Sequence, residues 1–177
     1  MKEERIIIAG AGGQGIMLLG KVLAEAAMRE NKFVTWLPSY GAEVRGGTAH
    51  CMVVVSDNEI GSPYITQADT LIIMNAPSLQ RFKQRIKSQG LCLINSSLIH
   101  QDIDSSRHNL KYPFTDIAVR LGDIRVANMV ALGCLVAHKD IVDKRTISRV
   151  ICEIAPPDKK HLIEINKKAL EEGMGLG

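Results

Sequence analysis

The segment from Ile6 to Gly15 constrains the fold more than any other part of the chain. Three isoleucines and an alanine lead into the spacing G-x-G-x-x-G, and apolar residues at helical spacing follow. A short, continuous apolar run bounded by glycine is typical of a parallel strand buried on both faces. A strand, a glycine turn and a helix in this order aim backbone N–H groups at an anion. The sequence therefore predicts an α/β fold with an anion-binding turn.

Strand and helix patterns alternate along the rest of the chain. Strands are predicted at 6–9, 33–37, 49–56, 64–65, 70–74 and 91–95, and helices at 15–29, 75–88, 126–138, 146–154 and 162–171, with a further helix beginning near 113. The first helix links two strands, which predicts a right-handed βαβ unit. A length of 177 residues suits one domain. We expect a single three-layer α/β/α domain over residues 1–177, with a Rossmann-like, mostly parallel sheet and one antiparallel hairpin near Ala49–Ile65.

The glycine turn lacks the partner that a nicotinamide site needs. Such a site uses an Asp or Glu about 20 residues further on, at the end of the second strand, to hold the ribose. That strand ends in Thr35-Trp36-Leu37-Pro38, which offers neither a carboxylate nor an arginine for a 2′-phosphate. The P-loop pattern is also missing. Two interpretations of this motif remain: a site for a different anionic ligand, or a tight turn that binds no ligand.

A second unusual loop spans residues 38–48 and should lie at the same carboxyl edge of the sheet. Arg45 stands next to two glycines, which places a guanidinium beside open backbone amides and suits a phosphate or carboxylate. The alternative is a glycine-rich turn whose Glu43–Arg45 ion pair contributes less than about 1 kcal/mol. Asn75 either points into the same crevice or caps the helix that follows it.

Together these patterns predict one ligand crevice. Its expected binding residues are Gly10, Gly12, Gly13, Gln14, Gly15, Tyr40, Glu43, Arg45, Gly46, Gly47, Thr48 and Asn75. Asn128 falls inside a predicted helix, where asparagine is a poor choice, so we expect it to hydrogen-bond to a loop or across an interface. The sequence groups no serine, histidine and aspartate as a triad and no carboxylates as an acid–base pair. We therefore assign no catalytic and no metal-binding residue.

Composition excludes several classes of function. Aromatic residues make up 4% of the chain and the net charge is only +3 with scattered lysines and arginines, so nucleic-acid binding is not expected. The four cysteines form no C-x-x-C pair, which favours buried free thiols in a reducing cytosol over zinc or iron–sulfur ligation. Neither a signal-peptide pattern nor an apolar run of about 18 residues is present, so we expect a cytoplasmic protein without membrane contact.

Three segments together resemble a known family. Residues 8–15, 38–49 and 127–133 are similar to the gamma subunit of 2-oxoacid:ferredoxin oxidoreductases, and the resemblance extends to about residue 155. It implies a complex that oxidatively decarboxylates a 2-oxoacid, transfers the acyl group to coenzyme A and reduces ferredoxin. It also implies that thiamine diphosphate, Mg²⁺ and 4Fe–4S clusters belong to partner subunits (alpha, beta and delta), with coenzyme A as a possible ligand of this chain. The loop at 38–41 favours 2-oxoglutarate or branched-chain oxoacids over indolepyruvate.

Two alternatives stay open. One is a nucleotide-binding regulatory domain, which predicts that the isolated chain binds NAD or a flavin nucleotide. The other is a structural assembly subunit whose crevice receives a loop of a partner subunit rather than coenzyme A.

Overall fold

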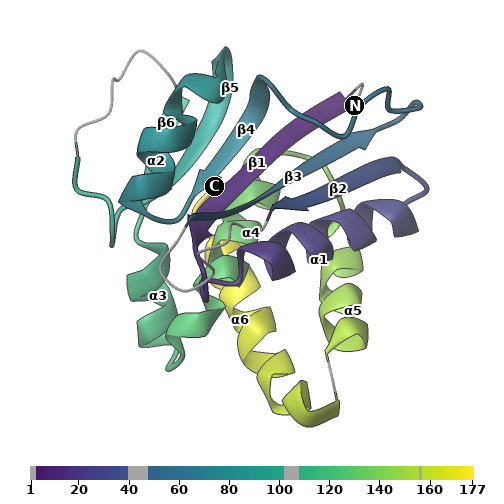
Figure 1. The fold of residues 1–177 in the computed structure, drawn as a ribbon. Helices are drawn as coiled ribbons and strands as arrows, with labels where there is room; N and C mark the ends of the chain where they lie inside the picture. The colour runs from purple at the N-terminus through teal and green to yellow at the C-terminus, as the bar shows by residue number, and fades with distance from the viewer. Residues whose placement is uncertain (1–2, 40–47, 102–107, 156) are drawn as a thin grey trace.

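The computed structural model describes residues 3–39, 48–101, 108–155 and 157–177, which form one mixed sheet and its helices (Figure 1). The strands, in the spatial order β2-β3-β1-β4-β5-β6, are β1 (Glu3–Ala11), β2 (Phe33–Ser39), β3 (Thr48–Ser56), β4 (Ala68–Ile73), β5 (Ile86–Asn95) and β6 (His108–Tyr112). The helices are α1 (Ile16–Arg29), α2 (Ala76–Phe82), α3 (Phe114–Arg120), α4 (Ala127–His138), α5 (Lys144–Ile154) and α6 (Ile163–Met174).

Strand β3 runs against all the others. It pairs antiparallel with both β1 and β2, whereas β1, β4, β5 and β6 pair in parallel. The mostly parallel sheet is thus confirmed, but the expected hairpin near Ala49–Ile65 is wrong, because residues 64–65 form no strand. The predicted βαβ unit also has β3 inserted between its two strands. Strand β3 has a neighbour on each side and is buried on both faces. Its local sequence indicates such an interior strand but does not show which strands flank it.

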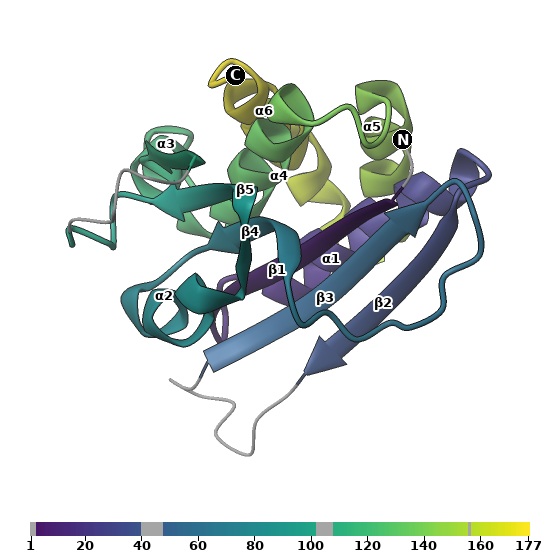
Figure 2. The same cartoon turned by 90° about the horizontal axis from the view of Figure 1, so that it is seen from above.

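Helices cover both faces of the sheet, but unequally. Helices α1, α3, α4, α5 and α6 bury one face, against which Ile6 and Ile8 of β1 pack. The opposite face carries α2 and the segment around Ile65, which bury Ile7 and Ala9 of β1. Figure 2 shows α2 on the side of the sheet opposite α4, α5 and α6. The expected α/β class with helices on both faces is confirmed.

Two local expectations fail in the middle of the chain. Helix α2 ends at Phe82 rather than near residue 88, because a single 3₁₀ turn follows and β5 begins at Ile86, which pairs with Ala68 of β4. Strand β6 is not among the predicted strands. It is a half-buried edge strand of five residues, and its short polar sequence lacks a clear alternation.

Helices α4 and α6 approach each other closely through two glycines. A Cβ atom added at Gly133 would lie 2.0 Å from the carbonyl oxygen of Leu170, and one added at Gly173 would lie 2.0 Å from that of Val130. Only glycine permits backbones to pack this tightly. This contact holds the C-terminal helix against α4, whose first turn reaches the glycine turn.

Candidate functional site

The glycine turn joins β1 to α1 at the carboxyl edge of the sheet. Gly13 and Gly15 have φ values of +91° and +70°, a backbone region that disfavours residues with a Cβ atom. A Cβ added at Gly15 would lie 2.3 Å from the side-chain nitrogen of Asn128, whereas one added at Gly13 would meet no atom of the described residues within 4 Å. Gly13 therefore has no close neighbour among the described residues, while Gly15 packs against α4.

The side chain of Gln14 fixes the turn from within. Its Oε1 accepts a hydrogen bond from the backbone N–H of Ala11 at 2.6 Å, and its Nε2 donates to the carbonyl oxygen of Met74 at 3.3 Å. Both polar groups of this predicted binding residue are thus engaged within the protein. A Cβ added at Gly10 would lie 2.7 Å from Gln14 Oε1, so Gly10 makes room for this side chain.

The carbonyl oxygen of Met74 connects three strand ends. It also accepts from Asn95 Nδ2 at 3.3 Å, and the same amide donates to Thr115 Oγ1 at 2.8 Å. Asn95 is fully buried, and its Oδ1 accepts from the backbone N–H of Thr115 at 3.3 Å. These bonds tie the ends of β1, β4 and β5 to the start of α3. Sequence reasoning missed this network, although an asparagine closing an apolar strand was the available signal.

Two asparagines resolve alternatives that the sequence left open. Asn75 caps α2, since its Oδ1 accepts from the backbone N–H of Ser78 at 3.0 Å. Asn128 bonds to a loop, since its Nδ2 donates to the carbonyl oxygen of Gly15 at 3.1 Å. The first turn of α4 thereby holds the first turn of α1 in place.

The second predicted loop is seen only at its two ends. Its expected binding residues Tyr40, Glu43, Arg45, Gly46 and Gly47 lie outside the described residues. Thr48 begins β3 and pairs with Ala11, the last residue of β1 before the glycine turn. The chain therefore enters β3 directly beside the turn that contains Gly12 and Gly13.

A buried histidine lies next to this edge on the α2 side. His50 pairs with Ala9, is 7% exposed, and its ring lies 4.9 Å from that of Phe82. Burial, and then the positive charges of Arg81 and Arg85, lower the pKa of His50, which favours the neutral imidazole. Its Nδ1 is buried and has no hydrogen-bond partner among the residues that the structure describes. The strand pattern around His50 gave no reason to single it out.

All four cysteines are free, and three of them are buried. Cys51, Cys92 and Cys134 are buried and Cys152 is partly exposed. Burial raises the pKa of the Cys51 and Cys134 thiols to about 12, so both stay protonated at neutral pH. Neither is suited to act as a nucleophile.

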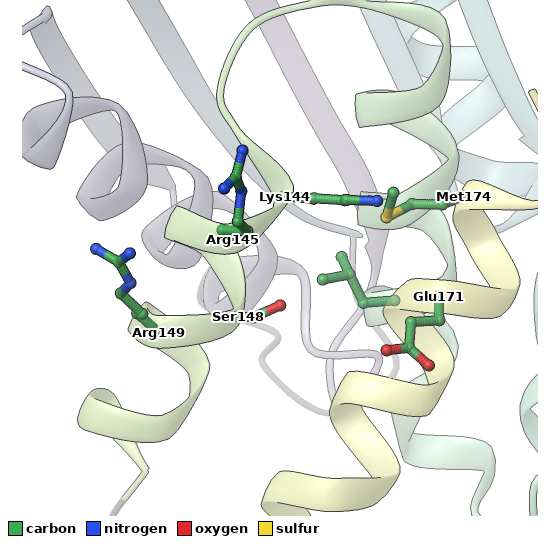
Figure 3. A pocket seen from close by; sticks show the side chains of 7 residues that line it. Lys144, Arg145, Ser148, Arg149, Glu171 and Met174 are labelled. Atoms are coloured by element: carbon green, nitrogen blue, oxygen red, sulfur yellow. The ribbon is translucent and has the colours of Figure 1, made fainter.

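A separate groove of about 580 Å³ lies between α5 and α6 (Figure 3). Lys144 reaches across it toward Met174, and Ser148 and Glu171 line it from the two helices. It contains none of the residues predicted to bind a ligand. Among the described parts of the chain, no helix is long and apolar enough to cross a bilayer.

Comparison with known proteins gives close relatives along almost the whole chain. The ketoisovalerate oxidoreductase subunit VorA of Methanothermobacter thermautotrophicus is 36% identical over 97% of this chain, which spans only 36% of that protein. The 2-oxoglutarate synthase subunits KorC of Archaeoglobus fulgidus and Methanocaldococcus jannaschii are 32% and 34% identical, over 99% and 94% of this chain and 89% and 92% of their own lengths.

Solved structures share the fold. The gamma subunit of a keto/oxoacid ferredoxin oxidoreductase from Geobacter sulfurreducens has a TM-score of 0.86 at 28% identity, covering 99% of this chain and 96% of that one. A 2-oxoglutarate:ferredoxin oxidoreductase from Magnetococcus marinus has a TM-score of 0.90 at 23% identity, covering 99% of this chain and 31% of that one. The pyruvate ferredoxin/flavodoxin oxidoreductase family matches residues 5–176, and the chain belongs to this family.

Proposed function

We propose that this chain is the gamma subunit of a 2-oxoacid:ferredoxin oxidoreductase, with 2-oxoglutarate as the favoured substrate. The complex would release CO₂ from the 2-oxoacid, transfer the acyl group to the thiol of coenzyme A and pass the electrons to ferredoxin. The near full-length match to two KorC subunits supports this proposal, as does the likeness to the Geobacter gamma subunit. The favoured substrate rests on the names of the KorC relatives.

The redox chemistry of the proposed enzyme belongs to other chains. Alpha, beta and delta subunits would supply thiamine diphosphate, Mg²⁺ and the 4Fe–4S clusters, and ferredoxin would be reduced through the complex. The role proposed for this chain is to bind and orient coenzyme A. Free buried cysteines suit the cytoplasm, where thiols remain reduced, and we propose that location for the complex.

The glycine turn is the observation that carries the role in coenzyme A binding. The first backbone N–H groups of α1 have no partner within the helix, and the helix dipole adds partial positive charge at the same point. None of the described residues obstructs Gly13, and Thr48, the last residue of the second loop, pairs with Ala11 beside the turn. We propose that the pyrophosphate of coenzyme A is held between these two segments. The Magnetococcus enzyme of the same fold was solved with coenzyme A and succinyl-CoA bound.

Substitution of Arg45 in the assembled complex tests this assignment. The variant Arg45→Ala should raise KM for coenzyme A about tenfold, leaving kcat and the KM for 2-oxoglutarate unchanged, because one charge-assisted contact to the pyrophosphate is lost, worth about 1.4 kcal/mol. Arg149→Ala on α5, at the groove shown in Figure 3, is the control. An Arg45→Ala complex that assembles normally with an unchanged KM for coenzyme A contradicts the ligand role. Failed assembly supports a partner loop in the crevice instead.

A further inference from the structure

Three cationic or polar side chains surround the ring of Phe82 on the α2 face. The guanidinium carbons of Arg81 and Arg85 lie 5.3 and 5.7 Å from the ring centroid, and the His50 imidazole lies at 4.9 Å. Two arginines and a histidine are thus gathered at one point, where the end of α2 meets the start of β3.

The three side chains differ in their burial and in their hydrogen-bond partners. Arg85 donates to the carbonyl oxygens of Ile65 and Thr66, so its guanidinium is already engaged. Arg81 is exposed, and within the described ranges no carboxylate forms an ion pair with it. His50 is more than nine-tenths buried, and in the described part of the chain its Nδ1 has no hydrogen-bond partner. A buried polar atom without a hydrogen-bond partner destabilises the folded protein, and a ligand oxygen that bonds to Nδ1 would remove this cost.

The cluster lies beside the glycine turn. His50 is paired with Ala9 and Thr48 with Ala11, so the cluster begins two residues, about 7 Å of strand, from the edge where the turn opens. A ligand whose pyrophosphate sits at the turn can therefore bring a second anionic group to Arg81.

We propose that Arg81 and His50 form a second anion site, which receives a phosphate monoester of the ligand held at the glycine turn. This inference rests on the proposed binding of coenzyme A, whose ribose carries a 3′-phosphate in addition to its pyrophosphate. Arg81 supplies charge to the phosphate oxygens, and the imidazole of His50 supplies a hydrogen bond. Arg85 adds long-range positive charge while its own donors stay with residues 65–66. The site explains why two guanidiniums are kept near a neutral, buried histidine.

Dephospho-CoA, which lacks only the 3′-phosphate, is the matched probe. In the assembled wild-type complex, KM for dephospho-CoA should exceed KM for coenzyme A about tenfold. Arg81→Gln should raise KM for coenzyme A about tenfold and leave KM for dephospho-CoA unchanged, so that the preference disappears. His50→Phe keeps a ring against Phe82 but removes both nitrogens, and should reduce the preference about threefold. Arg149→Gln, an exposed arginine on α5, should change neither KM.

Three results overturn the proposal. The first is a wild-type complex with equal KM values for coenzyme A and dephospho-CoA. The second is an Arg81→Gln complex in which both KM values rise equally. The third is an Arg81→Gln complex that fails to assemble while the Arg149→Gln complex assembles. The last result would assign Arg81 to an acidic group of a partner subunit. The proposed function fails separately, when Arg45→Ala leaves the KM for both coenzyme A and dephospho-CoA unchanged.

Discussion

The side-chain amide of Asn128 donates to the carbonyl oxygen of Gly15 at 3.1 Å, and no Cβ atom fits between the two residues. This contact joins the first turn of α4 to the first turn of α1. It fixes the position of the helix end that we propose meets coenzyme A.

Alanine at the two left-handed glycines should separate conformational strain from crowding. Gly15→Ala introduces both backbone strain and crowding against Asn128, and should lower the free energy of unfolding by about 3 kcal/mol. Gly13→Ala introduces strain without crowding by any described residue, and should cost about 1 kcal/mol. Denaturant unfolding of the two variants checks this difference. Equal losses would show that Asn128 does not crowd residue 15.

The close approach of α4 and α6 predicts a strong effect at Gly133. Gly133→Ala forces the Leu170 backbone away and should destabilise the protein by about 2–3 kcal/mol. Gly175→Ala is the control, because its Cβ would lie no closer than 3.4 Å to any atom, and it should change stability by less than about 0.5 kcal/mol. Thermal unfolding measures both. A Gly133→Ala protein as stable as the control would mean that the two helices can separate freely.

Thiol reactivity should divide the cysteines by burial. Cys51 and Cys134 have pKa values of about 12, so at pH 8 they are protonated as well as buried, and Cys92 is buried. Only the partly exposed Cys152 should react quickly with a thiol reagent in the native protein. Counting released chromophore over time, with Cys152→Ser as the control, tests this. Fast reaction of two or more thiols in the native wild type would contradict the core packing.

His50 should make the stability of the protein fall as the pH is lowered. Its pKa is lowered in the folded protein by burial and by Arg81 and Arg85, so below the unfolded value of about 6.5 the unfolded state binds more protons than the folded state. The wild type should therefore lose more stability than His50→Phe as pH falls from 7 to 5. Chemical denaturation at several pH values follows this loss. Parallel pH profiles for the two proteins would show that His50 is not held neutral.

The sequence predicts part of this architecture because local patterns report local structure. The apolar run of β1, the glycine turn and the spacing of α1 are all local, and the structure has each of them. The insertion of β3 between β1 and β2 depends on pairing between distant segments, which the apolar sequence of β3 does not specify.

The candidate site divides in the same way. Gly15 and the cap at Asn75 follow from turn and helix rules. The side chain of Gln14 instead bonds to the carbonyl oxygen of Met74, which lies 60 residues further along the chain and is not predictable from local sequence. The His50–Arg81 cluster likewise requires α2 to end over β3, and no spacing in the sequence brings these residues together.

The KM for coenzyme A of the assembled complex carrying Gly13→Ala tests the central claim most directly. The added methyl group points into space that no described residue fills, where we place the pyrophosphate, and its left-handed backbone strain costs only about 1 kcal/mol of stability. Gly61→Ala is the control, because its Cβ also meets nothing within 4 Å but lies away from the turn. The account predicts a KM for coenzyme A about tenfold higher for Gly13→Ala, with kcat unchanged and the control at the wild-type value. The same KM in all three complexes would contradict binding of coenzyme A at the glycine turn.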